Sequence, residues 1–233
     1  MPNLHPLDNP IWNALNTEHG ELALGNKYAK RYPADIGPLG GIADDAARNY
    51  EELRALAGPG GTVVLFLEEP PTPKAGWTLV RNGLLSQMIL TSPVAWKGPP
   101  PGPAAIVRKL TAADVPSMQK LADLTEPGPF RLRTIDLGDF YGIFDSDRLV
   151  AMAGQRLHLP HFVEVSAVCT HPDARGRGYA RTLISVVVEE ILQRGKVPFL
   201  HSLFDNHQAI RVYEALGFTL RRTLQLAVLK SEE

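Results

Sequence analysis

The chain has 233 residues, of which 44% are hydrophobic, and a formal net charge of −1. This apolar content is enough for one large core or two small ones, and the charge gives no global bias toward nucleic acid or an anionic membrane. No apolar run approaches the roughly 18 residues of a membrane span, and the N-terminus lacks a signal-peptide pattern. With Cys169 as the single cysteine and no metal-ligand spacing among the histidines, we expect a cytoplasmic protein without an internal disulfide or a structural metal.

The first hundred residues carry helix and strand patterns but no binding motif. Asn9 and Pro10 favour the start of a helix over 11–24, and a second helix is expected over 44–57. A buried strand follows over 62–67. Residues 77–90 contain more strand, which could fold as a hairpin through Arg81, Asn82 and Gly83.

The clearest linker is KGPPPGP, residues 97–103. Consecutive prolines favour extended polyproline geometry and act as a semi-rigid spacer. We therefore predict an N-terminal α/β domain over 1–98, a linker over 99–103 and a second domain over 104–233.

The second domain begins with a strand over 106–109 and a helix that Thr111 caps and that continues to Leu124. A loop rich in proline, glycine and arginine is expected over 125–133. Strands over 140–144 and 149–157 are joined by a short turn, and a final strand is expected over 220–229.

The stretch over 161–218 indicates a binding site. An alternating apolar strand over 162–168 leads into a loop with Gly176 and Gly178, and an amphipathic helix follows. A helix start leaves backbone N–H groups unpaired and carries a partial positive charge, so this order is typical of a phosphate site. A second strand over 197–203 implies a parallel pair with a right-handed crossover.

The loop and the segment after it resemble two patterns of the GNAT superfamily of N-acetyltransferases, which use acetyl-CoA. Residues 175–180, RGRGYA, fit the family signature of Arg or Gln, two residues, Gly, one residue, and Gly or Ala. The segment NHQAIRVYEALGF, which ends at Phe218, fits the second pattern. The resemblance covers roughly 106–230 and implies a GNAT fold, with a central mixed twisted sheet and flanking helices.

The resemblance implies the residues that bind acetyl-CoA. They form the end of the strand, the glycine loop, the helix start and the downstream asparagine: Val168, Cys169, Thr170, Arg175, Gly176, Arg177, Gly178, Tyr179, Ala180, Arg181 and Asn206. Without the glycines the arginines would be read as a solvated basic patch. Asn206 could equally serve only as a helix N-cap, and the two roles are compatible.

Three residues are candidates for catalysis. Tyr213 matches the family position whose phenol protonates the leaving CoA thiolate, although its helix stripe would also suit a core residue. Glu164 and His201 are candidates for the base that takes a proton from the amine. An outward strand carboxylate and a buried core histidine are the alternatives. Direct transfer needs no acyl-enzyme, so no nucleophilic cysteine or serine is expected.

The resemblance implies transfer of an acetyl or acyl group from acetyl-CoA to an amine by direct attack in a ternary complex. The acceptor is a small molecule or a peptide, with no nucleic-acid or membrane partner. The alternative is a catalytically inactive CoA-binding regulatory module; a nucleotide site lacks the lysine and acidic residues it would need. For residues 1–98, a degenerate, cofactor-free GNAT half competes with a small lid or a dimerisation module, and a homodimer stays open.

Overall fold

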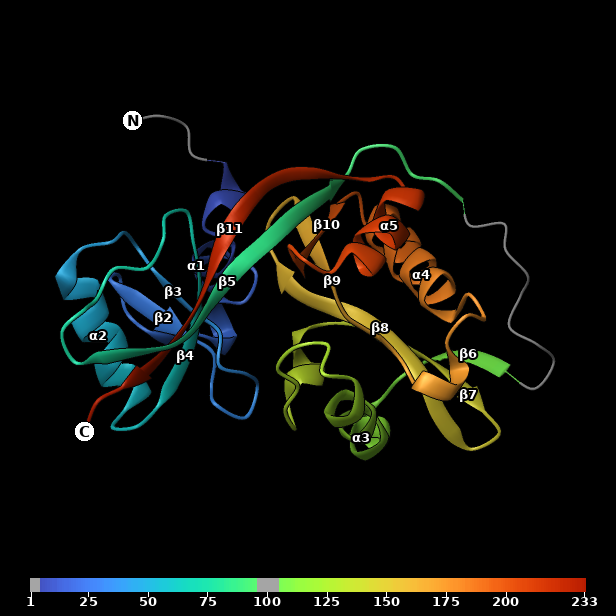
Figure 1. Ribbon diagram of the computed structural model, residues 1–233, viewed down its shortest axis with the longest axis horizontal. Helices are drawn as coiled ribbons and strands as arrows, with labels where there is room; N and C mark the ends of the chain where they lie inside the picture. The colour runs from blue at the N-terminus through green and yellow to red at the C-terminus, as the bar shows by residue number, and fades with distance from the viewer. Residues whose placement is uncertain (1–4, 96–104) are drawn as a thin grey trace.

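The computed structural model describes residues 5–95 and 105–233, and within them one eight-stranded mixed sheet has helices on both faces (Figure 1). The strand order is β4-β11-β5-β10-β9-β8-β7-β6. The strands are β4 (Thr62–Leu67), β5 (Trp77–Leu90), β6 (Ala105–Lys109), β7 (Phe140–Asp145), β8 (Arg148–His158), β9 (Phe162–Thr170), β10 (Val197–Leu203) and β11 (Phe218–Ser231). This architecture confirms the predicted fold class.

The remaining elements surround this sheet. A small sheet consists of β1 (Leu24–Gly25), β2 (Ala29–Arg31) and β3 (Gly40–Ile42). The helices are α1 (Pro10–Asn16), α2 (Ala47–Ala57), α3 (Val115–Thr125), α4 (Tyr179–Gln193) and α5 (His207–Ala215). Short 3₁₀ turns are η1 (Pro6–Asp8), η2 (Gly20–Leu22), η3 (Ala112–Asp114), η4 (Thr134–Leu137) and η5 (Pro172–Ala174). Every helix in the described parts of the chain is too short or too polar to span a bilayer.

Strands β5 and β11 run side by side through the middle of the molecule (Figure 1). They pair antiparallel from Phe218 opposite Leu90 to Ser231 opposite Trp77. The predicted hairpin at Arg81–Gly83 is therefore wrong. Residues 77–90 form one continuous strand because β11, which the hairpin prediction did not consider, pairs with it along its whole length.

The first helix is shorter than predicted. It ends at Asn16 instead of continuing to residue 24, and a 3₁₀ turn follows it. The side chains of Asn16 and Thr17 donate hydrogen bonds to the carbonyls of Trp12 and Asn13, both at 2.7 Å. Polar side chains that bond to nearby backbone groups compete with helix propagation.

The main sheet continues across the predicted domain boundary. The linker at 99–103 lies outside the described residues, but β4 and β5 precede it while β10 and β11 follow it. In the sheet these strands alternate, and β5 pairs with both β10 and β11. Residues 1–98 and 104–233 thus share one sheet, and their division into separately folding domains stays a prediction.

Each face of the sheet buries its own apolar clusters. Helix α4 packs on one face with Val163, Leu200 and Met88, and α3 packs on the opposite face with Met152 and other residues of β7–β9. Helix α2 covers the β4 end on the α4 side, and α1 covers the other side. Buried apolar side chains therefore hold strands from before and after the linker together, with burial contributing about 25 cal/mol for each Å².

Candidate active site

The site begins where two parallel strands separate. Strands β9 and β10 pair from Phe162 opposite Val197 to Glu164 opposite Phe199, and no pairing continues beyond this point. In β9 the register against β8 also shifts near Ala167, whose φ of 52° lies in the left-handed region. A cleft of about 1160 Å³ opens here, between the ends of β9 and β10, the start of α4 and helix α5.

The glycine loop forms one end of this cleft. Gly176 and Gly178 have φ values of 78° and 80°, which L-residues with side chains adopt only with strain. A Cβ atom built on Gly176 would meet no atom within 4 Å, so the loop faces open space. Helix α4 starts after Gly178 without a side-chain cap. Its first N–H groups can therefore donate hydrogen bonds to an anion.

The structure brings most of the predicted cofactor residues to the cleft. Its lining contains Val168, Cys169, Thr170, Arg175, Gly176, Gly178, Tyr179, Ala180, Arg181 and Asn206. Arg177 does not line the cleft: its guanidinium donates to the carbonyl of Asp173 at 3.3 Å and lies 3.6 Å from the Asp145 carboxylate. The Oγ1 atom of Thr170 is buried and has no hydrogen-bond partner among the described residues, which leaves a polar group for a ligand to satisfy.

Asn206 and Cys169 have roles in the fold as well. The Oδ1 atom of Asn206 accepts a hydrogen bond from the Ala209 N–H at 3.2 Å, so the residue is the N-cap of α5. Its amide nitrogen is left for other contacts. Burial raises the pKa of the Cys169 thiol to about 11, so it is a neutral packing group at pH 7.

Tyr213 lies on α5 with its side chain at the cleft. The residue is 8% exposed, and its ring packs edge-on against Phe218. No hydrogen bond to its hydroxyl occurs among the described residues. Burial raises the pKa of Tyr213 to about 12, so the phenol is protonated at neutral pH and able to donate.

Glu164 and His201 are in direct contact, although they belong to different strands. The Oε1 atom of Glu164 lies 2.7 Å from Nδ1 of His201, and both its carboxylate oxygens bind the Arg156 guanidinium at 2.5 and 2.8 Å. Burial opposes the charge on Glu164, but Arg156 and His201 lower its pKa to about 2. His201 and Arg156 line the cleft, whereas the fully buried Glu164 lies behind them.

The other nitrogen of His201 faces Gln87 on β5. Gln87 Nε2 lies 3.0 Å from His201 Nε2 and donates to the Leu7 carbonyl at 2.7 Å, while Gln87 Oε1 accepts from Arg221 at 2.7 Å. Since arginine only donates and a carbonyl only accepts, these partners determine the amide orientation. The Gln87 amide then donates to His201 Nε2, and His201 Nδ1–H donates to Glu164.

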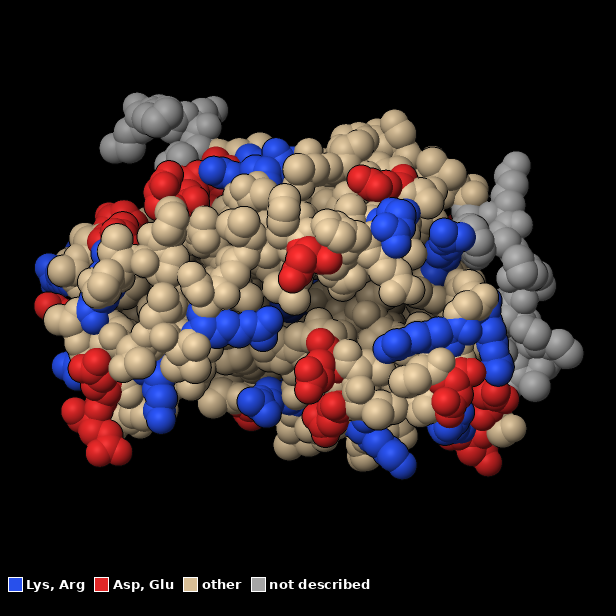
Figure 2. Space-filling model, in the orientation of Figure 1, with Lys and Arg blue, Asp and Glu red and all other residues tan. Residues whose placement is uncertain are grey.

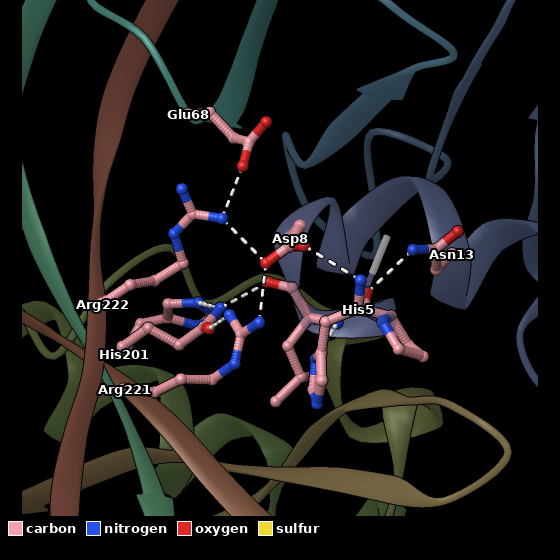
Figure 3. A network of polar contacts seen from close by, with 10 residues as sticks. His5, Asp8, Asn13, Glu68, His201, Arg221 and Arg222 are labelled. Atoms are coloured by element: carbon pink, nitrogen blue, oxygen red, sulfur yellow. Dashed lines mark hydrogen bonds and ion pairs between the residues drawn. The ribbon is translucent and has the colours of Figure 1, made fainter. Parts of the chain in front are cut away.

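The network continues from Arg221 to the N-terminal turn (Figure 3). Asp8 accepts hydrogen bonds from Arg221 and Arg222, both at 2.7 Å, and Arg222 also binds Glu68 at 2.5 Å. Burial lowers the pKa of His201, with Glu164 opposing and Arg156 assisting, so the imidazole is neutral at pH 7. The N-terminal segment thus helps to hold a histidine of the cleft in one tautomer.

Several residues of the cleft were not predicted from the sequence. Arg156 is paired with Glu164 across β8 and β9, and Phe66 of β4 lies 4.8 Å from the His201 ring. Arg81 on β5 and Arg131 in the loop after α3 also line the cleft. Of these residues, Arg131 alone had a signal in the sequence, because it belongs to the arginine-rich loop over 125–133. The others depend on strand pairings that no local pattern reveals. In the described parts of the chain, no cluster of His, Cys, Asp and Glu is suited to a metal ion.

Known proteins share this fold. Residues 140–226 match the family model of FR47-like proteins, while no curated protein matches the chain. A crystal structure from Novosphingobium aromaticivorans, described as an acetyltransferase of the GNAT family, is similar with 39% identity and a TM-score of 0.89. The match covers 99% of this chain and 100% of that one.

Two more distant structures share the fold. A GCN5-related N-acetyltransferase from Kribbella flavida has 13% identity and a TM-score of 0.62, with 96% of each chain covered. A GCN5-related N-acetyltransferase-like protein from Streptococcus suis has 14% identity and a TM-score of 0.54, with 90% of this chain and 82% of that one covered. On the 39% identity over nearly the full length of both proteins, the chain belongs to the GNAT family of acetyltransferases.

Proposed function

We propose that the protein is an N-acetyltransferase that moves an acetyl group from acetyl-CoA to an amine by direct attack in a ternary complex. The observation that carries the proposal is the open helix start after Gly178, next to the gap between β9 and β10. Backbone N–H groups of the loop and α4 would bind the phosphates, with Arg175 and Arg181 supplying positive charge. Thr170 and Asn206 would contact the pantetheine arm.

The acetyl group would lie between Tyr213 and His201, which line the same cleft. The amine nitrogen forms the new bond to the carbonyl carbon as the carbon–sulfur bond breaks. Tyr213 donates its proton to the departing thiolate, because its phenol is neutral at pH 7. The roles of Tyr213 and His201 are proposed from the family resemblance and from the position of both residues in the cleft.

We assign removal of the amine proton to the Glu164–His201 pair. His201 Nε2 is its basic atom, and it becomes available when the Gln87 amide releases it. The ionised Glu164 stabilises the imidazolium that forms. Since burial holds the pKa of His201 below its ordinary value of 6.5, the base is ready at neutral pH. The rate should then fall at acidic pH as His201 becomes protonated.

Calorimetry with acetyl-CoA tests the cofactor site. Gly178→Glu places a negative charge and a side chain at the helix start and should abolish binding. Gly178→Ala is the matched control, because it carries the same positive-φ strain without the charge or the bulk. If both variants bind acetyl-CoA as the wild type does, the cofactor site is elsewhere. A free-thiol assay over a panel of amines tests transfer, and a protein that binds acetyl-CoA but acetylates none of them would instead be a binding module.

A further inference from the structure

The cleft extends well beyond the proposed cofactor site, along one face of β4, β11 and β5. Alternate residues of a strand share a face, so Arg81, Gly83, Leu85 and Gln87 of β5 point to the same side. Gln87 is opposite His201 on β10, at the proposed reaction centre. Arg81 lies six residues earlier, roughly 20 Å away at about 3.3 Å per residue. The face shown in Figure 2 is hollowed near its centre, with charged side chains around the hollow.

The middle of this extension is apolar. Leu85, Leu226 and Phe66 line it. Leu226 pairs with both Phe66 and Gly83, which puts these three residues in one row across the sheet, and Leu85 lies in the neighbouring row, opposite Leu224. Val228 and Val64 form the next row and also line the cleft. An acceptor that occupies this length would bury apolar surface here, whereas a polyamine or an aminoglycoside would leave its polar groups without partners.

Two arginines mark the far end. Arg81 pairs with Val228, which in turn pairs with Val64, and Val64 forms a bridge with Leu39. Arg131 lies on the Leu39 side, because the Thr134 hydroxyl accepts from the Arg131 N–H and donates to the Ile36 carbonyl, both at 2.7 Å. Both arginines line the cleft, Arg81 from the sheet and Arg131 from the loop after α3.

Neither guanidinium has a hydrogen-bond or ion-pair partner among the described residues. Two other arginines nearby are paired: Arg133 binds Asp136 at 2.8 Å, and Arg156 donates two hydrogen bonds to Glu164. The two carboxylates that also line the cleft, Asp123 and Glu126, lie on α3 and just past its end. The unpaired positive charges of Arg81 and Arg131, beside the apolar extension of the cleft, are suited to an anionic group of a ligand.

We propose that the acceptor is an extended amine with an apolar body and a carboxylate at its far end, which Arg81 and Arg131 bind. The inference rests on the proposed function, since the amine must lie near His201 and the acetyl group. It excludes cationic acceptors such as polyamines.

Steady-state acetylation kinetics with two matched substrates test the proposal. One is an ω-amino fatty acid, and the other is the alkylamine of the same chain length. Loss of the carboxylate, or Arg81→Gln or Arg131→Gln, should lower kcat/KM for the acid about tenfold to a hundredfold, mainly through KM, as expected for a charge-assisted hydrogen bond. The alkylamine should be used equally by all variants. Arg133→Gln, which removes the same charge from the same loop outside the cleft, should change neither.

A second variant tests the length of the apolar extension of the cleft. A Cβ atom built on Gly83 meets no atom within 4 Å, so Gly83→Leu should fold and fill the apolar section. It should impair long ω-amino acids and leave a short alkylamine unaffected.

The proposal is overturned if the wild type uses the alkylamine as well as the acid, if Arg133→Gln is as harmful as the other two variants, or if no acid of the series is acetylated. In each case acetyl-CoA binding and thiol release with the short alkylamine report separately on the proposed function.

Discussion

Two regions of the sheet have a similar order of elements, but the proposed cofactor site belongs to only one of them. In the N-terminal region α2 leads to β4 and then to the long strand β5; in the C-terminal region α4 leads to β10 and, through α5, to the long strand β11. The long strands are exchanged, since β5 lies beside β10 and β11 lies beside β4 (Figure 1). This arrangement supports the hypothesis that residues 1–98 are a GNAT half without a cofactor.

The difference between the regions lies at the helix starts. Before α2, Asp44 accepts hydrogen bonds from the Ala46 N–H and the Asn49 amide, and Asp45 binds Lys74. At α2 these acidic side chains occupy the helix start and would repel an anion. At α4, Gly176 and Gly178 leave the helix start open. The β4–β5 connection also has no helix to correspond to α5, which carries Asn206 and Tyr213. The strands are repeated, whereas the open glycine loop and the helix that carries Asn206 and Tyr213 belong to the C-terminal region.

The largest expected effect comes from separating the regions. A fragment that starts near Pro103 lacks β4 and β5, so β10 and β11 lose their common partner. We expect it neither to unfold cooperatively nor to bind acetyl-CoA, as measured by thermal melting and calorimetry. A folded fragment with full affinity would instead establish the predicted boundary as a true domain boundary.

Tyr213→Phe tests the helix that only the C-terminal region inserts before its long strand, with a tyrosine on α2 as the control. It keeps the ring against Phe218 and removes the hydroxyl, so kcat should fall about 10²–10⁴-fold, with acetyl-CoA affinity little changed. Tyr50→Phe on α2 removes a hydroxyl that binds Asp45 at 2.9 Å and should leave kcat unchanged. Equal kcat values for the wild type and Tyr213→Phe would assign Tyr213 to packing alone.

Glu164→Gln tests the buried charges of Glu164 and Arg156, near the point where β9 and β10 separate. Loss of one member of a buried pair costs about 3–5 kcal/mol, because Arg156 then keeps an uncompensated charge. The folded pKa of Glu164, about 2, lies below its ordinary value of 4.5. Its contribution to the free energy of unfolding is thus complete above about pH 4.5 and is lost as pH falls toward 2.

Urea unfolding of the wild type and the variant over this pH range checks the prediction. The difference in unfolding free energy should narrow as the solution becomes more acidic. A difference that does not depend on pH would mean that packing, and not charge, makes Glu164 important.

The smallest effect is expected at Gln87, the contact of the N-terminal segment with His201. Its amide donates to the neutral imidazole, which disfavours protonation and lowers the His201 pKa. Gln87→Leu removes that donor, so the acidic limb of the pH–rate profile should move to higher pH by less than about one unit. A limb that stays in place, or moves to lower pH, would show that Gln87 does not control this titration.

Local sequence patterns predicted much of the fold. The strands over 62–67 and 197–203 have the predicted bounds, and the amphipathic helix follows the glycine loop as expected. These elements depend on neighbours within a few residues, through side-chain alternation and helix capping. The hairpin within 77–90 failed because a partner more than a hundred residues away determines whether that strand turns.

The sequence by itself determined the family resemblance, the glycine loop and the candidate residues Tyr213, Glu164 and His201, because these are properties of short segments. Only the tertiary structure decided that Arg156 pairs with Glu164, that Gln87 orients His201, and that Arg81 and Arg131 line the same cleft. Each of these contacts joins strands or loops that are distant in the chain. Sheet register and burial bring such residues together, and no local periodicity encodes the pairing of β5 with β10 and β11.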